Sequence, residues 1–354
     1  MKKIEAGKRF SAAAALLLLT AAAFAYNPPP AGELLYHFTS PFMLSGEVSA
    51  AGGPLFHVHP EHTAVNPALS AVEQRIVADV SYTALIAPNQ NKTYGQAFNI
   101  GTLIPSRYGV FTAVAQGVFV PFNDMLLKNT FTVRGAYSKD ITDWLYVGAG
   151  LYGGFGSDWA LGADIGCVYL PGTVKWLPFL SNVRFGFALT GLGKTYKPAT
   201  IGIDGLSEKI TSYPSIVTPR AGVAGTLFSV NKFSGGLSLD VSLPTFQNLV
   251  LDAGFQCLFA DIVRLSTGWQ INLREAIAQK ASWYPSISLS VKFGFTSADE
   301  SILSKKGWQQ SEIIAASAYR PMRANMHAFS TGAAMYLGLK DTAAPEITLW
   351  GNNE

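Results

Sequence analysis

Three histidines and a glutamate form a sharp local cluster within the six residues 57–62. The imidazoles of His57, His59 and His62 are suitable ligands for zinc or copper, although their i, i+2, i+5 spacing matches no standard zinc pattern. Because histidines gain charge near pH 6, a pH-sensitive segment is a second hypothesis. Hydrogen-bonded, purely structural histidines are the third, and the irregular spacing around Pro60 favours them.

Basic residues recur in phase with polar neighbours along segments that alternate between apolar and polar positions. They are Arg134, Arg184, Arg220, Arg264 and Lys292. The planar guanidinium of arginine binds a carboxylate through two hydrogen bonds, so these residues are candidates for binding the carboxylate head group of a fatty acid. Acidic residues share the same phase, at Asp158, Asp164, Asp240 and Asp252. Pairing of these charges with one another is the alternative, and we expect it for most of them.

An apolar ligand also needs an apolar pocket. Leu55, Phe56 and Val58, beside the histidines, are candidates for its lining, together with Val65. The alternative is that these side chains pack their own segment against neighbouring structure. The chain shows no G-x-S-x-G elbow, no P-loop and no Ser/His/Asp order that stands out. We therefore predict no catalytic residues, no cofactor and no enzymatic activity.

The elements that must position these residues follow a period of two. In residues 130–138, for example, Phe131, Val133 and Tyr137 alternate with polar residues. A helix would not keep the two sets on opposite faces. Many such segments predict a transmembrane β-barrel, whose strands show one face to lipid and the other to the lumen. We count about fourteen strands, at 75–86, 94–104, 108–119, 129–138, 144–155, 158–169, 183–192, 216–229, 233–243, 248–258, 262–272, 286–296, 312–319 and 327–338.

Composition supports the same fold class. Only 14% of residues are charged, where a soluble domain carries about 25%, and the mean hydropathy is +0.22. Beyond the N-terminus there is no apolar run of the roughly 18 residues that a spanning helix needs. Alternation explains how so apolar a chain distributes its hydrophobic residues. We predict an all-β, antiparallel transmembrane barrel, with a large soluble β-sandwich or barrel as the alternative.

The first 25 residues predict a secretory signal peptide. Four basic residues among the first nine precede an apolar run over 10–22, and Ala23-Phe24-Ala25 is an A-x-A cleavage site, so the mature chain would begin near Tyr26. Removing this segment takes four basic residues and one acidic residue from totals of 26 and 23, which leaves 22 of each. The mature protein is therefore neutral, and its charge gives no indication of nucleic-acid binding.

Residues 26–73 do not alternate and are rich in proline, glycine and alanine. We expect them to form a hatch or plug inside the barrel of residues 74–354, where irregular backbone at membrane depth finds polar partners. A disordered periplasmic tail is the alternative. An even strand count places both chain ends in the periplasm. On that orientation 139–143 is a short periplasmic turn, and 171–182 is an unusually long periplasmic connection.

The two cysteines, Cys167 and Cys257, both lie in phase with apolar neighbours. We interpret them as lipid-facing thiols on separate strands. A disulfide formed in an oxidising periplasm is the alternative.

Several short motifs resemble one known family. A small-residue stretch, Ala50-Ala51-Gly52-Gly53, leads to Asn66-Pro67-Ala68 just before the first strand, and 180–186 and 219–223 carry Asn/Arg/Gly strand starts. This arrangement resembles the FadL-type outer-membrane transporters of long-chain fatty acids and other hydrophobic molecules, most closely their poorly characterised spirochaete branch. The resemblance implies a fourteen-stranded barrel closed by an N-terminal hatch that contains Asn66, Pro67 and Ala68. The family's acidic pair before this motif is replaced here by Pro60-Glu61-His62.

The predicted function is therefore uptake of long-chain fatty acids or similar lipid-like ligands across the outer membrane by hatch-controlled passive diffusion. The protein would cross the membrane many times and contact its lipid directly. One alternative is a surface protein with a structural or ligand-binding role, whose outer loop over 194–214 contacts a partner. A small-solute porin is another.

Overall fold

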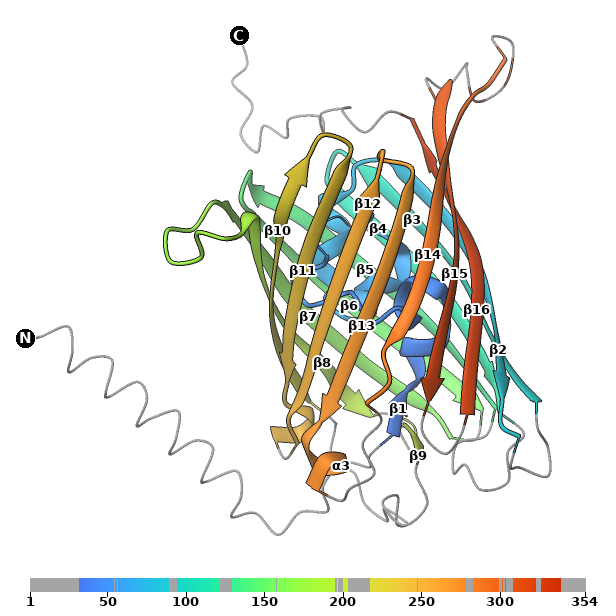
Figure 1. Ribbon diagram of the computed structural model, residues 1–354. Helices are drawn as coiled ribbons and strands as arrows, with labels where there is room; N and C mark the ends of the chain where they lie inside the picture. The colour runs from blue at the N-terminus through green and yellow to red at the C-terminus, as the bar shows by residue number, and fades with distance from the viewer. Residues whose placement is uncertain are drawn as a thin grey trace, which may run out of the picture.

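The computed structural model describes residues 32–338, apart from 54, 56, 89–93, 121–128, 157, 195, 197–199, 203–216, 247, 278–282, 299–300, 302, 304–307 and 323–325. Fourteen antiparallel strands close into a barrel, in which each strand pairs with its sequence neighbours and β16 pairs with β2 (Figure 1). The predicted signal peptide, Phe56 and most of the 194–214 loop lie outside the described residues. No helix in the described part of the chain is long and apolar enough to span a bilayer.

All fourteen predicted segments are strands, with ends that shift by four residues or fewer. The strands are β2 (Ile76–Ile86), β3 (Tyr94–Ser106), β4 (Gly109–Phe119), β5 (Thr130–Thr142), β6 (Leu145–Gly156), β7 (Ala160–Gly172), β8 (Ser181–Lys194), β10 (Thr218–Val230), β11 (Phe233–Ser242), β12 (Val250–Phe259), β13 (Val263–Asn272), β14 (Ser286–Thr296), β15 (Gln310–Met322) and β16 (Met326–Leu337). The prediction of a turn over 139–143 was wrong, because β5 continues to Thr142 through a bulge in its pairing with β6. Longer strands likewise reduce the 171–182 connection to residues 173–180.

Alternation of exposure along the strands shows which side chains face outward. On β14, Ile287 and Leu289 are half exposed, whereas the serines between them are buried. The same phase on β7 and β12 puts Cys167 and Cys257 on the outer wall, and both thiols are free. An apolar outer wall around a polar inner wall is the pattern of a transmembrane barrel.

The two ends of the barrel differ. At the turn end, residues 107–108, 143–144 and 231–232 join neighbouring strands by tight turns. At the opposite loop end lie α3 (Leu273–Ile277), η4 (Pro244–Phe246) and the short pair of β1 (Gly32–Leu34) with β9 (Thr200–Gly202) (Figure 1).

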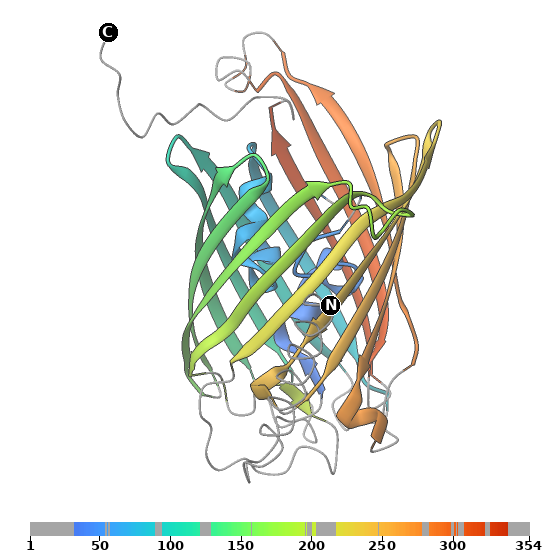
Figure 2. The same cartoon turned by 90° about the vertical axis from the view of Figure 1, so that its left-hand side faces the viewer.

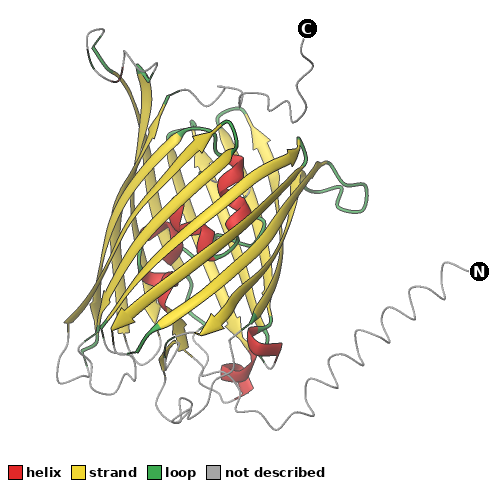
Figure 3. Cartoon of the chain, turned by 180° about the vertical axis from the view of Figure 1, so that it is seen from behind, coloured by secondary structure: helices red, strands yellow, loops and turns green. Residues whose placement is uncertain are grey.

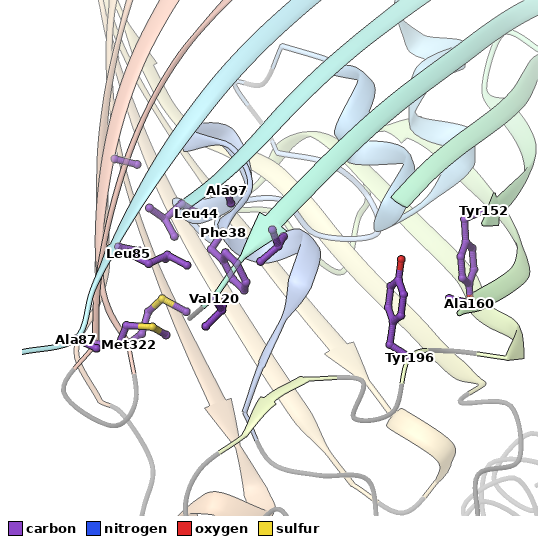
Figure 4. Close-up of a cluster of buried hydrophobic side chains, with 14 residues drawn as sticks. Phe38, Leu44, Leu85, Ala87, Ala97, Val120, Tyr152, Ala160, Tyr196 and Met322 are labelled. Atoms are coloured by element: carbon purple, nitrogen blue, oxygen red, sulfur yellow. The ribbon is translucent and has the colours of Figure 1, made fainter. Parts of the chain in front are cut away.

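Residues 36–73, here called the inner segment, run through the lumen from the loop end to the turn end (Figures 1 and 2). Its short helices are η1 (Leu35–Phe38), α2 (Pro41–Leu44), η2 (Pro60–Ala64) and η3 (Pro67–Val72), seen inside the wall in Figure 3. Phe38 and Leu44 from this segment pack with wall residues such as Leu85 and Met322 in a buried cluster (Figure 4). The core of the protein is therefore the contact between the inner segment and the wall.

Candidate functional site

The inner segment lies against the wall at positions where the wall has glycine. A Cβ on Gly186 of β8 would overlap the backbone of Ala50, and one on Gly166 of β7 would overlap the side chain of Asn66. A Cβ on Gly268 of β13 would overlap the carbonyl oxygen of Ser45. Since these neighbours are mostly backbone atoms, they cannot move aside as a flexible side chain would. Inward-facing glycines thus form a track along which the inner segment fits.

The Asn-Pro-Ala motif fastens the middle of the inner segment. Asn66 caps η3, because its Oδ1 accepts a hydrogen bond from the Ala68 N–H at 3.0 Å, and Pro67 fills the first helical position, where no N–H donor is needed. The Asn66 Nδ2 donates to the Ala50 carbonyl at 2.7 Å and to the Cys167 carbonyl of β7 at 3.1 Å. Ala68 is fully buried beside Gly148 of β6. One side chain therefore links both halves of the inner segment to the wall.

A buried ionic cluster holds the turn end of the inner segment. Arg75 donates from Nε to Glu73 at 2.9 Å and from Nη1 to Glu312 of β15 at 2.7 Å. Its guanidinium also stacks over the Tyr336 ring, 4.7 Å from the centroid. Tyr336 is fully buried and donates its hydroxyl hydrogen to the Val58 carbonyl at 2.9 Å. Charge, stacking and hydrogen bonds together fix the junction between the inner segment and β2.

The histidine cluster is structural in its contacts. His59 stacks on Phe42 with ring centroids 3.5 Å apart, and its backbone N–H donates to the His62 Nδ1 at 3.1 Å. His59 and His62 are both 1% exposed, while His57 is only half buried. No three His, Cys, Asp or Glu side chains converge as metal ligands within the described residues. These contacts favour the third hypothesis, that the histidines are structural, and provide no support for a metal site.

Burial disfavours the second hypothesis, charging near pH 6, for His59 and His62. Burial lowers the pKa of His62 to about 3, with Arg264 adding a smaller effect, and burial also lowers the pKa of His59 well below its usual value. Both residues belong to the inner segment and not to a membrane-spanning strand. They are neutral at physiological pH because a charged imidazole would lose its hydration inside the barrel.

Hydroxyl groups of the wall hold the loop-end half of the inner segment. Ser286 of β14 donates to the Ser45 carbonyl at 2.5 Å, and Ser238 of β11 donates to the Glu47 carbonyl at 2.6 Å. The Ala50 N–H in turn donates to Asp240 of β11 at 3.2 Å. The buried serines of the alternating strands therefore serve as partners for irregular backbone at membrane depth.

The five basic candidates all lie on lumen-facing positions, but the structure does not bring them together. Arg134 forms an ion pair with Asp164, and Arg220 pairs with Asp240 at 3.4 Å. Lys292 forms an ion pair with Asp261 at the turn end. This pairing agrees with the alternative expected for most of the charges.

The remaining two arginines differ from these pairs. Arg264 of β13 donates to the Leu55 carbonyl of the inner segment at 2.8 Å. Arg184 lies on β8, and its guanidinium is close enough to Tyr146 for their charges to interact. Neither arrangement presents an open guanidinium pair to a carboxylate.

Two of the apolar candidates, Leu55 and Val58, pack the inner segment, and a third, Val65, lines the small cavity described below. Val58 is 3% exposed and belongs to a cluster with Phe42, Leu103 and Ile314. Leu55 is half buried, and its N–H donates to Gln256 of β12 at 3.0 Å.

A small cavity of about 30 Å³ lies between the inner segment and the loop end. Such a volume holds about two water molecules, far less than the roughly 300 Å³ of a site for a drug-sized ligand. Its lining includes His37, Met43, Val48, Val65, Arg220, Asp252, Gln270 and Arg320. It is polar on the wall side and apolar on the inner-segment side.

Sequence reasoning missed several of the fastening residues. Arg75, Tyr336 and Glu312 lie close to predicted strand ends and carried no signal of their own. Arg320 of β15 was also missed, although it lies on the same phase as Glu312, Ala316 and Ala318 and is 9% exposed. The inward glycines are visible in the alternation only once the strand phase is known.

No family model and no curated protein matches the sequence. Among solved structures, a Pseudomonas aeruginosa FadL homologue is 14% identical, with a TM-score of 0.47 over 87% of this chain and 98% of that one. The Pseudomonas putida toluene transporter TodX is 9% identical, with a TM-score of 0.48 over 89% and 99%. The Ralstonia pickettii toluene transporter TbuX is 10% identical, with a TM-score of 0.46 over 85% and 98%. With TM-scores under 0.5, these similarities establish neither a family nor a substrate.

Proposed function

We propose that this chain is an outer-membrane transporter in which the inner segment acts as a hatch, and that hydrophobic molecules diffuse past it without an energy source. Long-chain fatty acids are the substrate class that the sequence resemblance favours. The observation that carries the proposal is the way in which the hatch is held. It fills the lumen, yet much of its backbone is bound by wall hydroxyls and glycine contacts that water can replace.

The energetics of these contacts suit a movable hatch. A hydrogen bond that water can replace stabilises by only about 1 kcal/mol net. The bonds from Ser286, Ser238 and Gln256 to the hatch are of this kind. Displacement of the loop-end half exchanges these weak hydrogen bonds for hydration, and its main cost is the exposure of the apolar side chains of Phe38 and Leu44, which pack against the wall.

A filled lumen also argues against the porin alternative. A porin needs an open aqueous channel through its barrel. Here η3 packs against β5, β6 and β7, while α2 packs against β14, β15 and β16 on the other side. The cavity described above holds only about two waters, and we take this arrangement as the closed state of the proposed transporter.

The proposal can be tested by locking the hatch to the wall. The hydroxyls of Ser70 in η3 and Ser138 in β5 lie 3.0 Å apart, so S70C/S138C places two thiols within bonding reach. The native cysteines would first be replaced, as C167S and C257S. T83C/S330C is the matched control, because these hydroxyls lie 2.7 Å apart on neighbouring strands and do not touch the hatch.

The readout is uptake of radiolabelled oleate by Gram-negative cells that lack their own outer-membrane fatty-acid transporter. We expect uptake through the unlocked protein, loss of uptake in oxidised S70C/S138C, recovery on reduction, and no effect of oxidation on T83C/S330C. Folded protein in the outer membrane that gives no oleate uptake would refute the fatty-acid proposal. Uptake that persists in oxidised S70C/S138C would refute the proposal that the inner segment acts as a hatch.

A further inference from the structure

The connection between β7 and β8 differs from the other turn-end connections. Residues 173–180 project sideways from the barrel wall at the turn end (Figures 1 and 3). The chain leaves and rejoins the wall at Gly172 and Asn182, which have φ of +74° and +50°. Two successive turns shape the connection, since the Leu177 N–H donates to the Val174 carbonyl and the Leu180 N–H donates to the Leu177 carbonyl. The connection is a short, folded projection beside the barrel.

The side chains of this projection are unsuited to water. It contains Val174, Trp176, Leu177, Phe179 and Leu180, with one lysine and no acidic residue. Trp176 is 69% exposed and Phe179 is 58% exposed. Of the tight turns at the same end, 231–232 is Asn231-Lys232, whereas 107–108 and 143–144 each add one exposed aromatic side chain, Tyr108 and Trp144. Exposed aromatic side chains gathered in one short loop mark a contact surface.

This surface is continuous with the outer wall of the barrel. The Trp176 ring stacks on Phe185 of β8 with centroids 5.8 Å apart, and Phe185 stacks on Tyr169 of β7 at 6.5 Å. Tyr169 then meets the Trp144 ring edge to face at 5.4 Å. A row of four aromatic rings thus joins the projection to lipid-facing positions of β7 and β8 and to the turn between β5 and β6. Tryptophan and tyrosine in this position are typical of the boundary between the hydrocarbon core and the head groups.

We infer that residues 173–180 are a membrane anchor that inserts into the periplasmic leaflet beside the barrel, with glycerophospholipids as its partner. Trp176 and Phe179 enter the boundary between head groups and acyl chains, and the exposed Lys175 reaches the phosphates. The turn end is assigned to the periplasm because the first strand of the barrel, β2, begins there and the last, β16, ends there, and because short turns are typical of the periplasmic side. The anchor does not depend on which molecule passes through the lumen.

The test places a fluorescent label on the projection. In a C167S/C257S background, F179C is labelled with an environment-sensitive NBD dye and the folded protein is reconstituted into phospholipid vesicles. K232C, on an exposed tight turn at the same end, is the matched control. Quenching is measured with nitroxide-labelled lipids and, separately, with aqueous iodide added on both sides of the vesicle membrane.

We expect the label at 179 to be quenched by the nitroxide lipids and protected from iodide at least twofold relative to the label at 232. Iodide quenching equal to that at 232 would overturn the anchor and leave the surface for a soluble partner. Protection from both quenchers would also overturn it, in favour of a second copy of this chain covering the loop. Heat-dependent mobility on gels confirms that each labelled protein is folded before it is compared.

Discussion

The two halves of the inner segment are held in different ways. The turn-end half, residues 57–73, is fixed by the buried cluster around Arg75 and by the packed rings of His59 and Tyr336. The loop-end half, residues 36–53, rests on wall hydroxyls, on the glycine track and on apolar packing by Phe38 and Leu44. Water can replace the hydroxyl hydrogen bonds at little cost, whereas the buried ion pairs around Arg75 lose much when water enters. On the proposed function, the loop-end half would move and the turn-end half would stay in place as its hinge.

The largest effect should come from a side chain placed in the glycine track. In G186V, the new side chain overlaps the backbone of Ala50 and pushes the loop-end half from the wall. Overpacking of this kind costs about 1–3 kcal/mol, which raises the displaced population by a factor of about 5 to 150. Single-channel recordings in planar bilayers should show conductance that the natural protein lacks.

The matched control for G186V is G294V. Gly294 lies on β14 with open space where a Cβ would be, so this change should leave the closed state as it is. If both variants stay closed, the glycine track does not position the hatch. If both conduct, the leak reflects general damage to the wall.

The next effect concerns the hinge. R75M leaves the carboxylates of Glu73 and Glu312 without their common partner, and breaking a buried ion pair costs about 3 kcal/mol. We expect a lower free energy of unfolding in urea titrations in lipid vesicles, and faster hydrogen exchange over residues 57–73. K292M removes a partner of the largely exposed Asp261 and a longer contact, 3.8 Å, with the partly exposed Glu312, and should cost under about 1 kcal/mol. Equal costs for R75M and K292M would contradict the special role of the buried cluster.

A smaller effect, the response to acid, should distinguish the two halves of the inner segment. The pKa values of His59 and His62 are lowered in the folded protein, to about 3 for His62 from an unfolded value of 6.5. A neutral imidazole is therefore part of the closed structure, and the stability it gives is present above pH 6.5 and is lost as the pH falls toward 3. Besides burial, His62, Arg264 and His57 lower the pKa of His59, and Arg264 lowers that of His62.

Hydrogen exchange between pH 6.5 and pH 4, corrected for intrinsic rates, should show protection falling first in residues 57–73. H62N should reduce this acid sensitivity, whereas H327N should not, because His327 lies on β16 in contact with Tyr319 and away from the hatch. If acid loosens residues 36–53 first, the assignment of the two halves is reversed.

The barrel could be predicted from the sequence because its signal is repeated. Each strand must alternate to satisfy lipid on one side and the lumen on the other, so errors in one segment are corrected by the next. The bulge that extends β5 to Thr142 left no such signal. The lipid-facing phase of Cys167 was likewise predictable, since a shift of one residue would have turned every apolar neighbour inward.

The hatch contacts could not be predicted in the same way. Arg75 and Tyr336 are separated by most of the chain, and only closure of the barrel between β2 and β16 brings them together. Arg220 and Arg134 were identified as lumen residues, but whether they bind a ligand or an aspartate depends on strand register. Alternation shows on which face of its strand a residue lies, but not which residue of another strand it contacts.

The smallest effect tests the weak contacts of the loop-end half directly. S286A and S238A each remove one hydroxyl that donates to a hatch carbonyl, at a cost of about 1 kcal/mol. We expect hydrogen exchange over residues 36–53 to quicken about fivefold in each variant, while residues 57–73 keep their protection. S330A is the control, because Ser330 contacts Thr83 of the wall and no hatch atom. Faster exchange in both halves would mean that the hatch moves as one body. That result would contradict the assignment of a hinge at Arg75.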